Sequence, residues 1–240
     1  MAKSPFYFDT NYREDTVLAD GTLVRLRLVR PSDKELIATG FKHLSPTSRY
    51  RRFLSAKTAL SESELTYLTE LDGTDHFALG AITTLSDGTE KGLGLARFVR
   101  QTVDPFIAEP AITVIDEAQG KGLGRLLLLR LMAAAVERGL RCFRSDVLVP
   151  NEPMRALLRE LVPEASVEPY EDIMRVDVPL PYLPANHPTD EMPKQNPLYR
   201  LLTLAAKLSL YAKHLSKSAR DSSEAYPKNS NTSLESDEDH

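Results

Sequence analysis

The chain has 240 residues, of which 42% are hydrophobic and 27% charged, as in an ordinary soluble globular protein. Its net charge of −4 argues against a dedicated nucleic-acid binder, because phosphate contacts need clustered Lys and Arg. The single cysteine, Cys142, excludes an intrachain disulfide and a cysteine-based zinc site, so no metal is expected and a cytoplasmic location fits. We find no apolar signal segment at the start and no run of about 18 apolar residues, so no transmembrane helix is expected.

Hydrophobic periodicity predicts strands and helices in alternation through the first hundred residues. Residues 22–30 alternate apolar side chains with Arg25 and Arg27, which indicates a strand with one buried face. Helix-capping residues follow three times. They predict helices at about 32–41, over the segment after Ser45-Pro46, and from 61 to about 72. Two further strands, 77–85 and 92–100, are joined by a polar link and form a hairpin.

The next eighty residues alternate strands and helices more regularly. Strands are expected at 111–115, 142–149 and 171–178, and helices at about 122–138 and 152–161. This order predicts an α/β or α+β domain over residues 21–179, with one mixed sheet covered by helices. Residues 1–20 are expected to be an N-terminal extension.

The stretch Asp116–Leu128 reads "DEAQGKGLGRLLL" and places glycines between an apolar strand and a leucine-rich helix. A helix N-terminus exposes unpaired N–H groups and the positive end of its dipole. Glycine lets an anion approach this backbone closely. The stretch lacks both the G-x-G-x-x-G dinucleotide fingerprint and a Walker A loop. It therefore predicts a phosphate site of another kind, the alternative being a helix start without a ligand.

Gln119, Gly122 and Gly124 fit the pattern Q/R-x-x-G-x-G/A, and here the chain resembles the GNAT superfamily of acyl-CoA-dependent N-acetyltransferases. The segments "HLSPTSRYRRF", "LGLARFVR", "AEPAITVIDEAQGKGLG" and "NEPMRALL" are similar to the bacterial protein lysine acetyltransferases of that superfamily, without a cyclic-nucleotide-binding domain. The resemblance implies a mostly antiparallel sheet of six or seven strands, and acetyl-CoA as the acyl donor. It also implies that the loop holds the pyrophosphate, through Gln119, Gly120, Lys121, Gly122, Leu123, Gly124 and Arg125.

The resemblance also implies roles for single residues. Glu109 matches the proposed general base, and the alternative is a solvent-exposed carboxylate at a strand end. His43 opens the segment that lines the acceptor side, but a histidine before a helix is more often a cap or surface residue. The backbone N–H near Ile115 corresponds to the oxyanion donor. Asn151 corresponds to a residue facing the pantetheine arm, although it also suits the N-cap of a short helix.

Some candidates are weaker on the residues alone. Asp116 and Glu117 precede the loop and are expected to point away from phosphates. The helix 152–161 contains no tyrosine, so the usual acid for the leaving thiolate is missing, and Tyr170 or a water is the alternative. Arg49, Arg51 and Arg52 are expected on the solvent side of their helix.

The last sixty residues differ in composition from the rest. Residues 180–197 are proline-rich and predict an extended linker. Residues 198–217 carry apolar side chains at spacings of three and four and predict an amphipathic helix, which docks on its own domain, on a second subunit or on a membrane surface. Residues 218–240 are polar and acidic, as disordered tails are.

The sequence as a whole predicts an acetyl-CoA-dependent N-acetyltransferase whose acceptor is a protein lysine. A small amine acceptor and a non-catalytic acyl-CoA-binding regulator are the alternatives.

Overall fold

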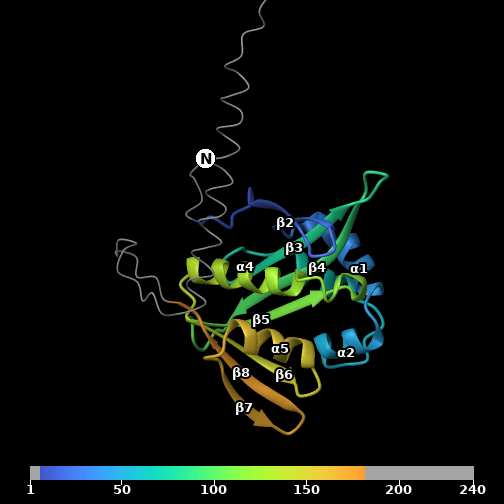
Figure 1. Cartoon of the computed structure of the whole chain (residues 1–240). Helices are drawn as coiled ribbons and strands as arrows, with labels where there is room; N and C mark the ends of the chain where they lie inside the picture. Colours follow the sequence, from blue (N-terminus) through green and yellow to red (C-terminus); the bar gives the residue numbers. More distant parts are fainter. Residues whose placement is uncertain (1–5, 182–240) are drawn as a thin grey trace, which may run out of the picture.

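Eight strands form one sheet in the computed structural model, which describes residues 6–181 (Figure 1). In chain order they are β1 (Arg13–Val17), β2 (Leu23–Leu28), β3 (His76–Thr84), β4 (Glu90–Arg100), β5 (Ile107–Val114), β6 (Cys142–Leu148), β7 (Ser166–Tyr170) and β8 (Ile173–Pro179). Their order across the sheet is β1-β2-β3-β4-β5-β6-β8-β7. Every neighbouring pair is antiparallel except β5 and β6. The mixed, mostly antiparallel sheet is confirmed, with eight strands where six or seven were expected.

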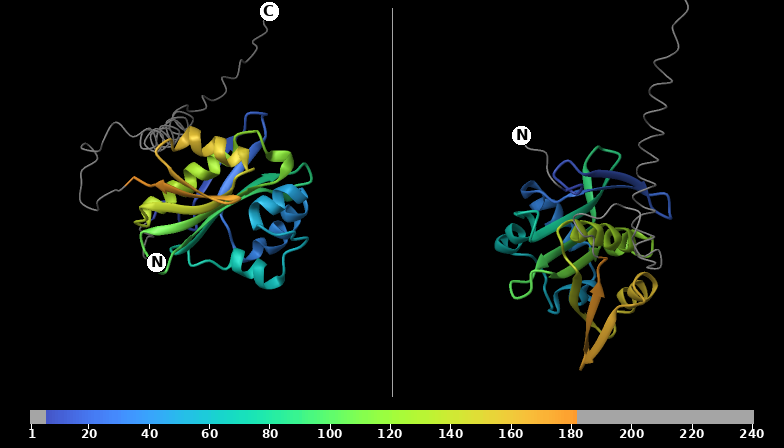
Figure 2. Two further views of the ribbon diagram at one scale, coloured as in Figure 1. Left: turned by 90° about the horizontal axis from the view of Figure 1, so that it is seen from below. Right: turned by 90° about the vertical axis from the view of Figure 1, so that its left-hand side faces the viewer.

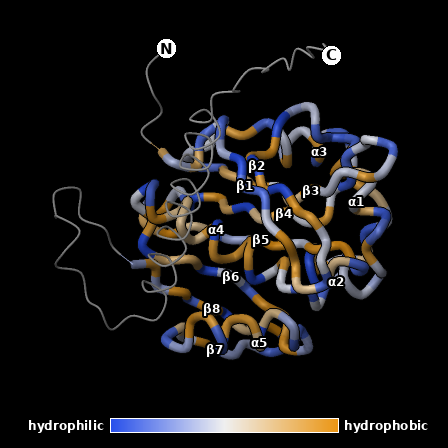
Figure 3. The backbone as a smooth tube through the Cα atoms, turned by 45° about the horizontal axis from the view of Figure 1, so that its top comes forward, coloured by the Kyte–Doolittle hydropathy of each residue, from blue (hydrophilic) through white to orange (hydrophobic). Residues whose placement is uncertain are grey.

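Helices cover both faces of this sheet, as the two views in Figure 2 show. They are α1 (Lys34–Lys42), α2 (Pro46–Phe53), α3 (Glu62–Thr69), α4 (Leu123–Glu137) and α5 (Glu152–Leu161). The first three lie on one face, and α4 and α5 lie on the other. Hydrophobic segments, orange in Figure 3, run along the central strands. Phe98 of β4 stacks on Phe77 of β3 and contacts Phe143 of β6, which joins the strands beneath α4.

The two strands that the sequence did not predict, β1 and β7, lie at opposite edges of the sheet. The sequence of β1 is "REDTV", and all five residues of β7 are exposed. An edge strand with little buried surface has no apolar alternation to reveal it. Within the segment predicted as an N-terminal extension, Phe8 and Tyr12 are buried in the core.

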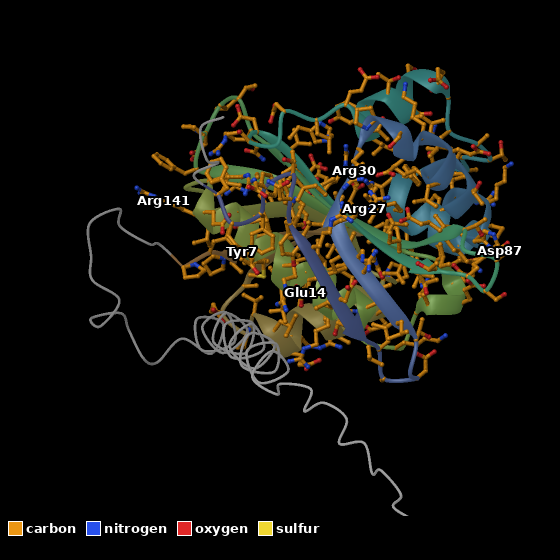
Figure 4. All side chains as sticks on the ribbon, turned by 90° about the horizontal axis from the view of Figure 1, so that it is seen from above. Tyr7, Glu14, Arg27, Arg30, Asp87 and Arg141 are labelled. Carbon is orange, nitrogen blue, oxygen red and sulfur yellow. The ribbon has the colours of Figure 1, made fainter. Side chains whose placement is uncertain are left out.

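The strand over 22–30 is confirmed as β2, but its expected polar face is not uniformly exposed. Arg25 pairs with Asp15 at the surface, whereas the guanidinium of Arg27 makes two hydrogen bonds with the buried carboxylate of Asp33, at 2.7 and 2.9 Å. Arg27 lies on β2 beside the helices of the α1 face (Figure 4). A period-two pattern with arginine indicates a solvent face, and here a buried ion pair occupies part of it.

Residues 180 and 181 follow β8, and the predicted linker, amphipathic helix and acidic tail otherwise lie outside the described residues. Within residues 6–181, no helix is long and apolar enough to cross a bilayer.

Candidate functional site

The glycine stretch forms a bend between β5 and α4, as the sequence predicted. A short 3-10 helix, Asp116–Ala118, follows β5, and Gly120 and Gly122 then adopt left-handed backbone conformations with φ of 72° and 88°. Residues other than glycine rarely adopt these backbone angles. Gly122 is the N-cap of α4 and offers no side-chain cap to the first turn, so the bend leaves that turn open.

The backbone N–H groups from Gly120 to Arg125 donate no hydrogen bond to any described part of the chain. A Cβ at Gly120 or Gly122 would meet no atom within 4 Å. Unpaired N–H groups at the start of a 15-residue helix attract an anion through their own partial charges and the helix dipole. The bend therefore has the donors and the open space that a diphosphate requires.

The side chains of the predicted phosphate site are largely occupied elsewhere. Lys121 pairs with Asp20 at 2.8 Å, and Arg125 pairs with Glu160 of α5 at 2.7 Å. Gln119 donates from its side chain to the Val114 carbonyl at 3.0 Å, and its backbone N–H donates to Asp116. Gln119 thus fixes the bend against β5, and the free donors are the amides that follow it.

β5 and β6 separate in front of this bend. They pair in parallel only at Ile107–Cys142 and Ala108–Phe143, and beyond these pairs the described strands make no ladder with each other. Because the strands are parallel, their carboxyl ends lie at one edge of the sheet, where the bend follows β5 and Asn151 follows β6. Asn151 caps α5 by accepting the Met154 N–H at 3.4 Å. Its capping role is confirmed.

The backbone N–H of Ile115, predicted as the oxyanion donor, already has a partner within the fold. The Ile115 N–H donates to the Leu93 carbonyl at 3.0 Å, so it is not available to a ligand. In an antiparallel ladder, N–H groups of alternate residues point to opposite sides. Val114 and Ile112 therefore direct theirs toward the separation between β5 and β6. Pro110, which has no N–H, occupies the same side.

A pocket lies on the face of the sheet that α1 and α2 cover, between β5 and these helices. It encloses about 700 Å³, counting the part open to solvent, and its walls are mainly apolar. Thr113 of β5, Ile115 just after that strand, and Arg52 of α2 line it. Since side chains alternate along a strand, Glu109 points to this same face.

Glu109 is exposed and lies in the first half of β5, opposite Val99 of β4. The glycine bend begins beyond the other end of the strand, roughly 20 Å away at about 3.3 Å per residue. A ligand anchored at the bend must therefore extend along the separation between β5 and β6 to react near Glu109. The site can thus hold an elongated anionic molecule between β5 and β6, with Glu109 as a candidate base beside it.

His43 lies apart from Glu109. It is the exposed C-cap of α1, and its carbonyl accepts the Asp116 N–H at 3.4 Å. The structure therefore places His43 beside the carboxyl end of β5 and does not bring these two candidates together. Asp116 accepts from the Ser45 N–H at 3.2 Å, and Glu117 pairs with Lys91, so both carboxylates have partners within the fold.

Tyr170 lies on the edge strand β7, which β8 separates from β6. Its side chain is 68% exposed. A donor on β7 would have to reach across both β8 and β6 to a thiolate between β5 and β6, so this geometry gives Tyr170 no role as the acid.

Sequence reasoning missed a cluster of side chains around Glu109. Arg52, expected at the solvent side of its helix, is half-buried, and burial and the neighbouring Arg97 lower the pKa of its guanidinium to about 10, an effect that Glu109 opposes. The guanidinium of Arg97 lies 4.9 Å from the ring centroid of Tyr67 and hydrogen-bonds to His76 at 3.2 Å. These residues come from α2, β4, α3 and β3, and no sequence spacing links them. Only the alternation within "LGLARFVR" signalled that Arg97 shares a face with Leu95.

Comparison with known proteins identifies the fold. The model of the acetyltransferase (GNAT) family matches residues 35–161. The acetyltransferase Pat of Mycolicibacterium smegmatis is 35% identical over 137 residues, which are 57% of this chain and 40% of that protein. The acetyltransferase PA5475 of Pseudomonas aeruginosa is 31% identical over 140 residues, which are 58% of this chain and 74% of that protein. The match thus spans less than half of the mycobacterial relative.

Solved structures agree with these matches. The GNAT domain of S. lividans PAT superposes with a TM-score of 0.64 and 27% identity, covering 72% of this chain and 99% of that one. A cAMP-binding acyltransferase from Mycobacterium smegmatis superposes with a TM-score of 0.50 and 27% identity, over 80% of this chain and 55% of that one.

Proposed function

The chain belongs to the acetyltransferase (GNAT) family, and from that premise we propose that it transfers an acetyl group from acetyl-CoA to the side-chain amine of a protein lysine. The observation that carries the proposal is the separation of β5 from β6 between the open glycine bend and Glu109. The segments similar to bacterial protein lysine acetyltransferases support lysine as the acceptor, and the single cysteine suits a reducing cytoplasm.

Acetyl-CoA suits the two parts of this site. The free amides from Gly120 to Arg125 would hold the pyrophosphate, because oriented N–H groups bind anions without a charged side chain. The pantetheine arm would extend between β5 and β6, with Asn151 at the mouth of the separation. The thioester would then lie near the middle of β5, within reach of an amine arriving from the α1–α2–α3 face.

The acceptor must lose a proton before it attacks. A lysine amine has a pKa of about 10.4, so deprotonation at pH 7 costs about 4–5 kcal/mol at ~1.36 kcal/mol per pH unit. We assign the base to Glu109, which receives this proton directly or through a water. The nitrogen then bonds to the carbonyl carbon, the carbon–sulfur bond breaks, the thiolate of coenzyme A leaves, and the new amide nitrogen gives up its second proton to water.

Charge develops on the carbonyl oxygen during this attack. The N–H groups of Ile112 and Val114, on the side of β5 away from β4, would stabilise it. Helix α5 contains no tyrosine to protonate the thiolate. We therefore expect the thiolate to leave as the anion or to take its proton from water.

Replacing Glu109 with glutamine tests this mechanism. We expect kcat for a lysine peptide to fall by about 10²–10⁴-fold, the usual contribution of a general base, while the Kd for coenzyme A, measured by calorimetry, stays the same. Glu168→Gln changes another exposed strand glutamate, on β7, and should leave both values unchanged. An unaltered kcat in Glu109→Gln would remove Glu109 from the mechanism.

The acceptor class is tested with labelled acetyl-CoA. Incubation with a cell lysate, followed by mass spectrometry, should locate acetyl groups on lysine side chains. Turnover of free amines without modification of any protein would instead indicate a small-molecule acetyltransferase. Binding of acetyl-CoA without transfer to any acceptor would indicate a regulatory protein.

A further inference from the structure

Two arginines near Glu109, Arg52 of α2 and Arg97 of β4, have no carboxylate partner in the described chain; we call them the arginine pair. Arg97 forms no ion pair with residues 6–181, and its side-chain Nε is buried without a hydrogen-bond partner among them. Its other contacts are the His76 ring nitrogen at 3.2 Å and the face of Tyr67. None of these groups carries a full negative charge near neutral pH.

Arg52 is in a similar position. Its guanidinium lies 4.9 Å from the ring centroid of Phe53 and makes no hydrogen bond or ion pair with residues 6–181. Burial disfavours its charge, and Arg97 adds like-charge repulsion. Glu109 is near enough to offset part of this cost, but it forms no ion pair with either arginine.

Two buried arginines of this protein, Arg27 and Arg138, have polar partners for their guanidiniums. Arg27 has Asp33 and Glu90, and Arg138 donates to the carbonyls of Gly73, Ala134 and Phe8. Buried charges are usually paired because an unpaired one costs several kcal/mol. The arginine pair departs from this rule, as does the buried Nε of Arg49. The arginine pair lies beside the candidate base, on the face from which an acceptor would arrive.

An acceptor amine is itself a cation before it loses its proton. It would meet two guanidiniums and one carboxylate, a local excess of positive charge that repels it. A negative group on the acceptor would reverse this repulsion and would give Arg97 the partner that its Nε lacks. Arginine binds carboxylates through paired, charge-assisted hydrogen bonds.

We propose that the arginine pair binds a carboxylate carried by the acceptor next to its reactive amine. This inference rests on the proposed function and narrows its acceptor class to amines with a neighbouring acidic group. The carboxylate is either an acidic side chain flanking the target lysine or the acid group of a small amino acid. Tyr67 and His76 form the wall that positions Arg97 for this contact.

The test compares acceptors that differ only in that charge. Two capped heptapeptides carry a central lysine flanked on both sides by glutamate or by glutamine, and 6-aminohexanoate is compared with hexylamine. We expect kcat/KM at least tenfold higher for the glutamate peptide than for the glutamine peptide. If the carboxylate belongs to a small molecule, the preference will appear with 6-aminohexanoate over hexylamine and not between the peptides.

Variants then assign the preference to the arginine pair. Arg97→Gln and Arg52→Gln should each reduce the ratio of kcat/KM between the charged and neutral acceptors to below threefold. The ratio is internal to each enzyme, so a general loss of activity does not imitate this result. Arg51→Gln, on the same helix as Arg52, is the matched control and should keep the wild-type ratio. If a variant fails to fold, a fall of the wild-type ratio with added NaCl serves in its place.

Equal kcat/KM for charged and neutral acceptors, or an unchanged ratio in both variants, would overturn the arginine pair as a carboxylate site. Fluorescence anisotropy of the labelled peptides, measured with coenzyme A present, separates this failure from failure of the proposed function. Tighter binding of the glutamate peptide without acetyl transfer would keep the carboxylate site and reject the catalytic proposal. Equal binding without transfer would reject both.

Discussion

Arg25 and Arg27 lie two residues apart on β2 and carry the same charge, but their surroundings give their ion pairs different weights. The side chains of Arg25 and Asp15 are 42% and 68% exposed, whereas those of Arg27 and Asp33 are 6% and 10% exposed. Water screens the first pair, so it contributes little to stability. In the second pair, loss of one partner leaves a buried charge that water cannot solvate.

Asp33→Ala and Asp15→Ala test this difference. We expect Asp33→Ala to lower the free energy of unfolding by about 3 kcal/mol, because Arg27 then keeps only the Glu90 carboxylate at 3.1 Å. Asp15→Ala should lower it by less than about 1 kcal/mol. Urea denaturation of both variants, followed by circular dichroism, measures the two values. Similar losses would show that burial does not decide the weight of these pairs.

The same contrast explains which site residues the sequence could reveal. Glu109 lies within a local motif, so a resemblance carries over to its position in the chain. Lys121 and Arg125 also lie in the motif, but residue type alone does not show that Asp20 and Glu160 neutralise them. Arg52 on α2 and Arg97 on β4 approach each other only in the folded protein, so no local sequence pattern could predict that they are neighbours.

At the scale of elements, the bend between β5 and α4 combines two uses of glycine. Gly120 and Gly122 need left-handed backbone angles, and the space where their side chains would lie is open. Gly139, at the end of α4, has the same two properties, with φ of 75° and no atom within 4 Å of a Cβ. The three glycines therefore have the same backbone requirement. They differ in that Gly120 and Gly122 lie among the free amides and Gly139 does not.

Gly122→Ala and Gly139→Ala separate strain from ligand binding. Each should lower the free energy of unfolding by about 1 kcal/mol, the cost of left-handed backbone in a residue with a Cβ. Only Gly122→Ala should also weaken coenzyme A, by at least tenfold in the Kd measured by calorimetry, because its methyl group enters the space before the helix. An equal Kd in the two variants would exclude the bend as the pyrophosphate site.

The elements best predicted from the sequence are those with an internal pattern. α4 has a glycine-rich start, a leucine-rich body and Gly139 at its end, and the expected span of about 122–138 compares with Leu123–Glu137. Strand β5 was expected to begin at 111 and begins at Ile107, because Glu109 and Pro110 interrupt its apolar run. The separation of β5 from β6 depends on pairing across the sheet, which no single segment encodes.

At the scale of the whole molecule, the first strand is tied to the helix that follows the glycine bend. Arg130 of α4 makes two hydrogen bonds of 2.7 Å with the carboxylate of Glu14 on β1, labelled in Figure 4, and Tyr12 donates to the same carboxylate at 2.5 Å. Glu137 of α4 accepts the Phe8 N–H at 3.2 Å. The N-terminal segment therefore holds α4 in place from outside the motif that identifies the site.

The carboxylates of this contact respond to acid in opposite directions. Burial by itself would raise the pKa of Glu14, but hydrogen bonds from Arg130 and Tyr12 outweigh it and lower the pKa. Burial raises the pKa of Glu137. A lowered pKa means that Glu14 stabilises the fold above the pKa of an unfolded glutamate, about 4.3, and loses that contribution as the pH falls further. Protonation of Glu137 in the same range favours the folded state instead.

Glu14→Gln isolates the first effect, because Glu137 is unchanged in both proteins. At pH 7 we expect the variant to be less stable than the wild type by about 2 kcal/mol, the value of hydrogen bonds to a charged group. Below the pKa of an unfolded glutamate, about 4.3, the unfolded chain takes up a proton at position 14 before the folded chain does, so the difference should shrink as the pH falls from 5 to 3. Urea denaturation at pH 7, 5 and 3 measures it, with Glu168→Gln on β7 as a variant whose difference from wild type should stay small throughout. A constant difference across this range would mean that the contact depends on the shape of the side chain at position 14 and not on its charge.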